Sequence, residues 1–441
     1  MFASEPYPHD RLPTSHSSAA EKEHQWRTWA AREIQHRALL AYYVLDGLSA
    51  QMSGESTSVR HTANQLGFPS SGAVFEANSA EEWLIYMRGQ NKQPLASSPP
   101  SFRTIFHQLF SPTEALPPQL PLLVQAPSSF SVRVILEGLQ SLLSDCDCDD
   151  ENEDEETQSS PSYATAVGAP MKSDLRRALA RIYDVINRTP NIAPEERLEL
   201  LLRWHTICLD TATCSAQLCG AVCAAYNVTQ YVVGYSAKAP SRSTSSSPAF
   251  DLRKWVHTSN ARRALLHSVA IQDIVEQLPR GRAHVIHMPS SLFAAATVYI
   301  VFCFAGATRI NLPRTVSWED VVVLPATAHT TPNSAPNSQG TFTETEACLT
   351  LGELAASTPA TGTAAGATNS STAENNTRRY IHGDCGPADG SLASSASSPC
   401  ATRNVLYELN SMQKLFRCLI SQWGIAHDME SVVDRWIALC H

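Results

Sequence analysis

The chain has 441 residues, of which 43% are hydrophobic and 7% aromatic, which is enough to build a buried core. Charged residues make up only 17%, below the roughly 25% of an ordinary globular protein, and Ser, Thr, Ala and Pro take their place in long stretches. The net charge is −9, and the acidic run from Asp145 to Glu156 accounts for all of it. Because the remainder is neutral, a basic nucleic-acid-binding surface is not expected.

The sequence predicts neither a signal peptide nor a membrane-spanning helix. The first residues lack a basic segment followed by an apolar run, so no signal peptide is predicted. The longest apolar stretch, 292–307, is shorter than the ~20 residues that a spanning helix needs, and a buried helix is predicted there. Twelve cysteines without regular spacing are typical of reduced thiols in the cytosol or nucleus.

Apolar periodicity predicts an all-α, bundle-like fold with long disordered insertions. In chain order, the predicted helices are 24–51, 175–187, 194–226, 258–277, 290–305, 403–423 and 429–439. Pro194 followed by two glutamates is typical of a helix start, because proline fits the first position and acids favour the positive end of the helix dipole. The apolar stripe of 403–423 is expected to pack on the core, since it is too large to remain exposed. Strand-like alternation occurs only at 231–235 and 321–324.

The predicted organisation alternates helical regions with segments that contain too few apolar residues to fold. Helical regions are predicted at 24–90, at 91–143 after a short linker, at 171–325 and at 403–441. Disorder is predicted at the N-terminus (1–23), in an acidic and Ser-rich linker (144–170), in a Ser-rich loop (238–248) and in a low-complexity region (326–402).

The first predicted helix places two charges on its apolar face. At about 100° per residue, Glu33 and Arg37 project between Trp29, Leu40 and Val44. The two residues are four positions apart with the acid first, which is the favourable order for an ion pair. Because buried charges are costly unless they are paired, we expect a structural ion pair with further partners on neighbouring helices.

The residues around this pair resemble a known family. Trp26-x2-Trp29-x3-Glu33-x2-His36-Arg37, followed by Tyr43-Val-Leu-Asp46, is similar to the signature of the fungal-specific transcription factor regulatory domain of the xylanolytic-activator type. This is the middle homology region of fungal zinc-finger activators. The segment 66–83 continues the resemblance, and the looser segments 262–267 and 415–425 are similar to the subset with paired Cys2His2 fingers. The residues that carry it are Trp26, Trp29, Glu33, Arg37, Asp46, Pro69, Glu76 and Trp83.

The resemblance implies a regulatory domain that acts in the nucleus, in regulation of RNA polymerase II transcription, through the transcription machinery or co-regulators. A homodimer is compatible with it. In the family, DNA and zinc are bound by a separate finger module, and neither C-x2-C-x6-C nor Cys2His2 spacing occurs in this sequence. The chain begins close to the signature, so we expect a truncated product that has lost this module. It would then have no cofactor or metal ligand, and would contact DNA only through the missing module.

Four cysteines cluster at 208–223 and could suggest zinc. Cys208, Cys219 and Cys223 project onto the apolar face of the predicted helix, whereas Cys214 lies opposite. No C-x-x-C pair is present, so these cysteines are predicted to be small buried core residues.

The acidic run resembles a calcium loop only in part. Asp145, Asp147 and Asp149 have the spacing of the first three ligands, but Asp150 occupies the position that requires glycine. Crowded negative charges favour a solvated linker, for which we hypothesise contacts with basic partners or the general transcription machinery.

Enzyme motifs are absent from the sequence, and no catalytic residue is predicted. Gly234-Tyr-Ser236-Ala-Lys238 approaches a nucleophile elbow but ends in lysine instead of glycine. Neither phosphate-binding glycine motif nor an H-E-x-x-H motif occurs. Two alternatives remain: an α-helical scaffold or adaptor unrelated to transcription, which nuclear localisation would distinguish, and an enzyme whose polar groups converge in a pocket.

Overall fold

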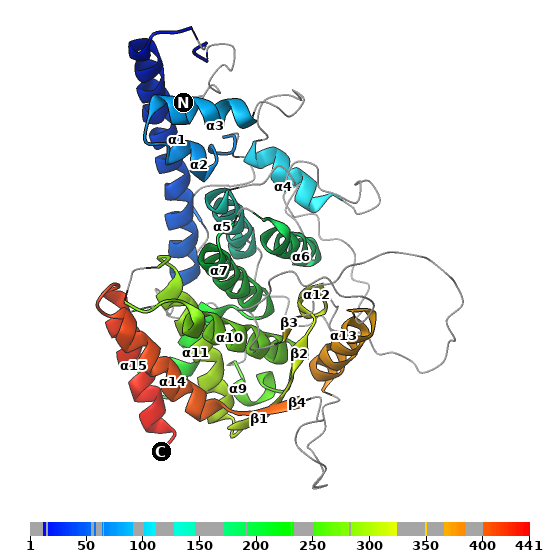
Figure 1. Cartoon of the computed structure of the whole chain (residues 1–441). Coiled ribbons are helices and arrows are strands. Elements are labelled where there is room, and N and C mark those ends of the chain that lie inside the picture. Colours follow the sequence, from blue (N-terminus) through cyan, green and yellow to red (C-terminus); the bar gives the residue numbers. More distant parts are fainter. Residues whose placement is uncertain are drawn as a thin grey trace, which may run out of the picture. The chain divides into compact units, whose positions relative to one another are not determined.

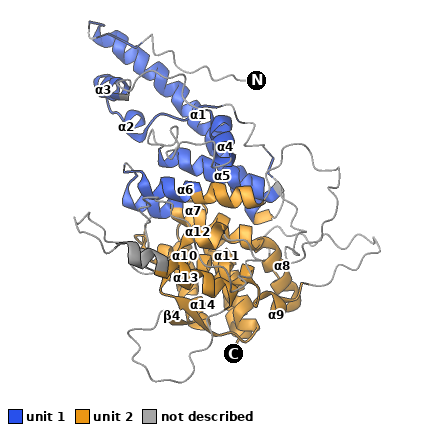
Figure 2. Ribbon diagram, turned by 90° about the vertical axis from the view of Figure 1, so that its right-hand side faces the viewer, with its two compact units in different colours: residues 1–51, 55–145, 181–200 blue, residues 52–54, 146–180, 201–441 orange. Residues whose placement is uncertain are grey.

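The fold is given by a computed structural model. It describes residues 12–14, 16–53, 57–58, 64, 66–90, 101–111, 128–145, 172–190, 192–230, 232, 250–281, 284–323, 349–350, 366–383 and 400–441. These residues form fifteen α-helices and four short β-strands (Figure 1), which confirms the predicted all-α class. The chain divides into two compact units (Figure 2), unit 1 from 1–51, 55–145 and 181–200, and unit 2 from 52–54, 146–180 and 201–441.

Unit 1 contains the N-terminal helices. Its elements are nearly all of α1 (Ala19–Ser53), then α2 (Gly72–Phe75), α3 (Ala80–Gln90), α4 (Phe102–Phe110), α5 (Ser129–Asp145), the end of α6 (Lys172–Arg188) and the beginning of α7 (Pro194–Ala212). Ser101 caps α4, because its side chain accepts a hydrogen bond from the Thr104 N–H at 3.2 Å. Helix α7 begins at Pro194 with two glutamates in its first turn, as predicted.

Two glycines allow α5 to pack closely against its neighbours in unit 1. A Cβ atom on Gly47 of α1 would lie 3.2 Å from the Cβ of Glu137, and one on Gly138 would lie 3.0 Å from ring atoms of Phe106 on α4. Side chains at these positions would therefore force α1 and α4 away from α5.

Two arginines stabilise helix ends in unit 1. Arg181 donates to the carbonyl oxygens of Leu109 and Ser111 at 2.7 and 3.0 Å, where α4 ends. Arg197 donates to the carbonyl oxygen of Asn187 at 2.7 Å, in the last turn of α6. The last carbonyls of a helix lack intrahelical donors and carry partial negative charge. A guanidinium at this position donates the missing hydrogen bonds and also offsets the partial charge.

Unit 2 is built around one apolar helix. Its remaining helices are α8 (Ser215–Ala225), α9 (Leu252–Trp255), α10 (Ser259–Gln277), α11 (Met288–Phe304), α12 (Trp318–Val323), α13 (Gly366–His382), α14 (Val405–Leu419) and α15 (Ile425–Leu439). Helix α11 is apolar on all sides and packs against α8, α10, α14 and α15. It is the buried helix predicted from the apolar stretch at 292–307. The predicted packing of the 403–423 stripe is also confirmed, because the apolar face of α14 is buried.

The strands form two small antiparallel pairs in unit 2. Strand β1 (Arg309–Pro313) pairs with β4 (Cys400–Asn404), and β2 (Thr315–Val316) pairs with β3 (Leu349–Thr350). Asn404 ends β4 and also caps α14, since its side chain accepts hydrogen bonds from the N–H groups of Leu406 and Tyr407.

Two predicted elements are wrong. The helix predicted at 194–226 is divided into α7 and α8, because the Asp210 carboxylate accepts the Ser215 N–H at 3.1 Å and a new helix begins there. The strand predicted at 321–324 overlaps α12, whose first turn carries two acids that favour a helix start. The strand predicted at 231–235 lies outside the described residues except for Val232.

Part of the predicted disorder is also wrong. Helix α1 begins at Ala19, inside the segment 1–23, and β3, α13 and the start of β4 lie inside 326–402. Helix α13 is polar overall, but Ala373, Thr377, Tyr380 and Ile381 form a buried stripe at helical spacing. The predicted linker 144–170 lies outside the described residues from 146 onward, as does the loop 238–248.

Candidate functional site

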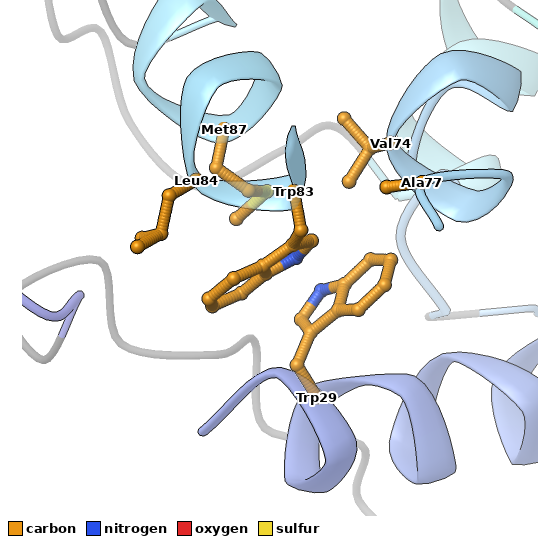
Figure 3. Packing of buried hydrophobic residues seen from close by; sticks show 6 residues of the cluster. All are labelled: Trp29, Val74, Ala77, Trp83, Leu84 and Met87. Atoms are coloured by element: carbon orange, nitrogen blue, oxygen red, sulfur yellow. The ribbon is translucent and has the colours of Figure 1, made fainter. Parts of the chain in front are cut away.

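Residues that carry the family resemblance meet in unit 1. The rings of Trp29 on α1 and Trp83 on α3 lie with centroids 5.6 Å apart and tilted by 42°. Figure 3 shows Trp29 pointing from α1 toward Trp83. Trp26 is half-buried against the same group. We call this group the tryptophan cluster, and its buried members are Trp29, Val74, Ala77, Trp83, Leu84 and Met87.

Next to the tryptophan cluster, an ion pair holds α1 to the loop that precedes α2. Arg37 Nε donates to Glu33 Oε1 at 2.9 Å, which is the pair that the helical projection predicts. The Ser70 N–H donates to the same carboxylate oxygen at 2.9 Å, and Arg37 Nη2 donates to the Ser70 carbonyl oxygen at 2.6 Å. We call Glu33, Arg37 and Ser70 the charge clamp. The Glu33 and Arg37 side chains are only 7% and 18% exposed.

Aromatic rings cover the guanidinium of the charge clamp. The Arg37 Cζ atom lies 3.9 Å from the ring centroid of Phe75 and 5.6 Å from that of Phe130. Both distances fall within the range of cation–π attraction. Phe75, which is itself exposed, therefore covers one face of the Arg37 guanidinium.

His36 lies beside the charge clamp and is held neutral. Burial lowers the pKa of His36, and the neighbouring Glu33 carboxylate and a backbone hydrogen bond with Gly67 only partly offset this effect. The clamp therefore contains one paired positive charge and one paired negative charge, and its chemistry is that of a fixed contact between α1 and residues 66–71.

The remaining residues of the resemblance are divided. Pro69 is buried directly before Ser70 and restricts the backbone that the charge clamp holds. Asp46 lies farther along α1, where its side chain accepts a hydrogen bond from the Ser58 N–H at 3.2 Å. Glu76 is exposed at the end of α2. The structure thus brings together Trp26, Trp29, Glu33, Arg37, Pro69 and Trp83, and leaves Asp46 and Glu76 outside.

Unit 2 contains a buried histidine pair that the sequence did not reveal. His205 Nδ1 and His267 Nδ1 are 3.0 Å apart, and the ring of Trp318 stacks on His267 at 5.2 Å. Burial lowers the pKa of both, to about 3 for His267, where the charge of Arg263 adds to the effect. Both imidazoles are neutral, with one donating to the other. No local motif signals this pair, because its members are 62 residues apart.

The cysteine cluster is part of the core, as predicted. Cys208, Cys219 and Cys223 are buried, whereas Cys214 precedes the first turn of α8. Burial raises the pKa of the Cys208 thiol, which keeps it protonated. Among the described residues, no group of three or more His, Cys, Asp or Glu side chains is arranged to hold a metal ion.

Comparisons with known proteins add no relative to these observations. No protein-family model, curated protein or solved structure matches the chain. Within the described part of the chain, no single helix is long and apolar enough to cross a membrane, and α7 with α8 meets that test only as a pair bent by 64°.

Proposed function

We propose that this chain is the α-helical regulatory domain of a fungal zinc-finger transcription factor, acting in the nucleus through contacts with the transcription machinery or co-regulators. Zinc and DNA would be bound by a finger module, whose ligand spacing this sequence lacks. The proposal contains no catalytic step.

One observation carries the proposal. Residues spread from Trp26 to Trp83 match the family pattern, and those at the tryptophan cluster and the charge clamp support one another physically. Trp29 and Trp83 pack α1 against α3, while Glu33 and Arg37 hold the intervening loop. A pattern that arose by chance along the sequence would have no reason to converge in this way, and this convergence supports the resemblance.

The polar groups of the site support a role in contacts between elements. The Glu33 carboxylate is occupied by Arg37 and Ser70, and the Arg37 guanidinium is occupied by Glu33, Ser70 and Phe75. Because these groups already have partners, the site acts by fixing the geometry of α1, α2 and α3. A regulatory domain needs a surface held in one geometry for its partner.

A tethering experiment tests the proposal. The full chain would be fused to an unrelated DNA-binding domain and expressed in a filamentous fungus that carries the matching reporter gene. We expect reporter output to change several-fold, up or down, relative to the DNA-binding domain alone. A fluorescently tagged chain without the fusion should accumulate in the nucleus.

Matched variants connect the output to the site. Glu33→Ala should abolish the change in reporter output, whereas Glu23→Ala should leave it intact because the Glu23–Arg27 pair on the same helix is exposed. An unchanged reporter together with exclusion of the tagged chain from the nucleus would contradict the proposal and favour a scaffold or adaptor outside transcription.

A further inference from the structure

Two reduced thiols of unit 2 face each other where α11 and α15 end. Cys303 lies in the last turn of α11, and Cys440 directly follows the last turn of α15. The two helices pack against one another, and the ring of Phe293 stacks on that of Trp436 at 5.5 Å in the same contact. The Cys303 S–H donates a hydrogen bond to the Cys440 sulfur. We call Cys303 and Cys440 the thiol pair.

The thiol pair combines one protected sulfur with one that a reagent can reach. Cys303 is only 8% exposed, whereas Cys440 is half-buried. The hydrogen bond from Cys303 lowers the pKa of Cys440, although burial opposes this effect. The same hydrogen bond, together with burial, raises the pKa of Cys303. Because the thiolate is the nucleophilic form of cysteine, Cys440 is the thiol that reacts first with an oxidant.

We propose that Cys303 and Cys440 form a reversible disulfide when hydrogen peroxide oxidises the chain, and that this bond locks the end of α15 onto α11. The Cys440 thiolate attacks the peroxide and breaks its O–O bond, which gives a sulfenic acid and, with the proton that the thiol released, one water. Cys303 then attacks the Cys440 sulfur, an S–S bond forms, and the displaced hydroxide leaves as a second water with the Cys303 proton. Thiol–disulfide exchange with a dithiol reverses the reaction.

A second pair of neighbouring thiols, Cys219 and Cys223, is less suited to this reaction. Both are buried, so an oxidant reaches neither of them directly. Both also lie on α8, four positions apart, where the Cβ atoms of a helix are about 5–6 Å apart. A disulfide requires Cβ atoms about 3.5–4.5 Å apart, so closing this pair would distort α8. Cys440, by contrast, lies just past the regular turns of α15, where the backbone can adjust.

The disulfide would hold the last helix of unit 2 in place. Helix α15 packs on α11 and α14, with Trp436 fully buried. The cross-link joins residues that are far apart in the sequence, and closing a long loop removes conformational freedom from the unfolded chain. Oxidised unit 2 should therefore resist unfolding more than reduced unit 2. Disulfides that form in reducing compartments are typically transient and redox-sensing, which is the role this pair suits.

Peptide mapping of the full chain tests the inference. The reduced chain would be treated with a small molar excess of hydrogen peroxide, alkylated, digested and analysed by mass spectrometry. We expect a peptide in which Cys303 and Cys440 are joined, and its loss after treatment with dithiothreitol. Cys418→Ser is the matched control, because Cys418 is exposed on α14, and it should leave the joined peptide unchanged.

Serine variants of the thiol pair separate the two steps. In Cys303→Ser the sulfenic acid on Cys440 has no thiol to resolve it, so labelling of Cys440 by dimedone should rise several-fold over the parent. Peroxide should raise the melting temperature of the parent by several degrees, and this shift should vanish in Cys303→Ser and in Cys440→Ser. Circular dichroism should show that both variants keep the parent fold, since serine retains a hydroxyl donor.

Three results would overturn the inference: no joined peptide in the oxidised parent, a peptide that joins Cys219 and Cys223 in its place, or dimedone labelling of Cys440 that Cys303→Ser leaves unchanged. Mapping of the parent needs no variant, so a variant that fails to fold does not affect the first two results. The measurements need no reporter, so this inference can fail or succeed independently of the transcriptional role.

Discussion

Glu33 and Arg37 show how one residue pair decides the stability of unit 1. Glu33→Ala would leave the Arg37 charge without its counter-ion and the Ser70 N–H without its acceptor. Breaking a largely buried pair costs about 3 kcal/mol or more, so we expect the melting temperature of this variant to fall sharply. Thermal unfolding followed by circular dichroism measures it.

The exposed pair on the same helix provides the control. Glu23→Ala should cost at most about 0.5 kcal/mol, since surface pairs contribute little. Replacing Glu33 and Arg37 together by Leu and Met should recover part of the loss, because no buried charge is then left unpaired, although the Ser70 N–H and carbonyl oxygen lose their partners. Equal melting of Glu23→Ala and Glu33→Ala would show that α1 does not bury this pair.

The histidine pair makes the stability of unit 2 depend on pH. An unfolded histidine has a pKa near 6.5, whereas burial lowers the folded pKa of His267 to about 3. Below pH 6.5 the unfolded state therefore takes up protons that the folded state does not, and the free energy of unfolding falls as the pH falls. From pH 7 to pH 5 we expect a loss of about 2 kcal/mol from His267 alone, with a further loss from His205, whose pKa is also lowered.

Denaturant unfolding at several pH values measures this slope. His267→Gln should reduce it, and the double variant with His205→Gln should reduce it further, whatever the absolute stability of each variant. His257→Gln, at an exposed position that follows α9, is the matched control variant. A parent protein equally stable at pH 7 and pH 5 would contradict the buried, neutral state of the pair.

At the scale of elements, α13 is an integral part of unit 2 despite its polar composition. Ile381 is fully buried and α13 packs on α10 and α12, with Arg378 paired to Asp320 at 2.9 Å. Ile381→Ala should cost about 2–5 kcal/mol, because it removes buried methyl groups and leaves a cavity. Arg379→Ala, at an exposed position of the same helix, should stay within about 0.5 kcal/mol. Similar melting of the two variants would mean that α13 is not docked.

The same elements show how far periodicity can predict this fold. Helices that are richer in apolar residues, such as α1, α10 and α14, are predicted to within about five residues of their ends. Helix α13 was missed because its stripe is short and surrounded by Thr, Asn and Ser. The pairing of β1 with β4 joins segments far apart in the sequence, and nothing local specifies it.

In the candidate site, too, contacts within one helix can be predicted from the sequence, whereas contacts between separate segments cannot. The Glu33–Arg37 pair could be predicted because both residues lie on one helix, where spacing determines proximity. Their partner Ser70 and the contact between His205 and His267 depend on how separate segments pack, so the sequence alone did not predict them.

For the whole molecule, charge predicts weak contact with nucleic acid. The net charge is −9, so few phosphate charges can be neutralised and the affinity for duplex DNA should be low. In mobility-shift titrations, any binding by the purified chain should be independent of sequence and lost as salt rises from about 50 to about 200 mM. Sequence-specific binding that survives physiological salt would contradict the proposal that DNA reading belongs to a separate finger module.

Unit 1 is assembled from separate stretches of the chain, so its segments are synthesised at different times. Helices α1 to α5 are complete at Asp145, but residues 181–200 of α6 and α7, which belong to the same unit and include Arg181 at the end of α4, are translated later. At about 5–20 residues per second, nascent α1 to α5 wait several seconds for those segments. During that interval the apolar faces of these helices are incompletely covered, which is when a chaperone would be expected to bind the emerging chain.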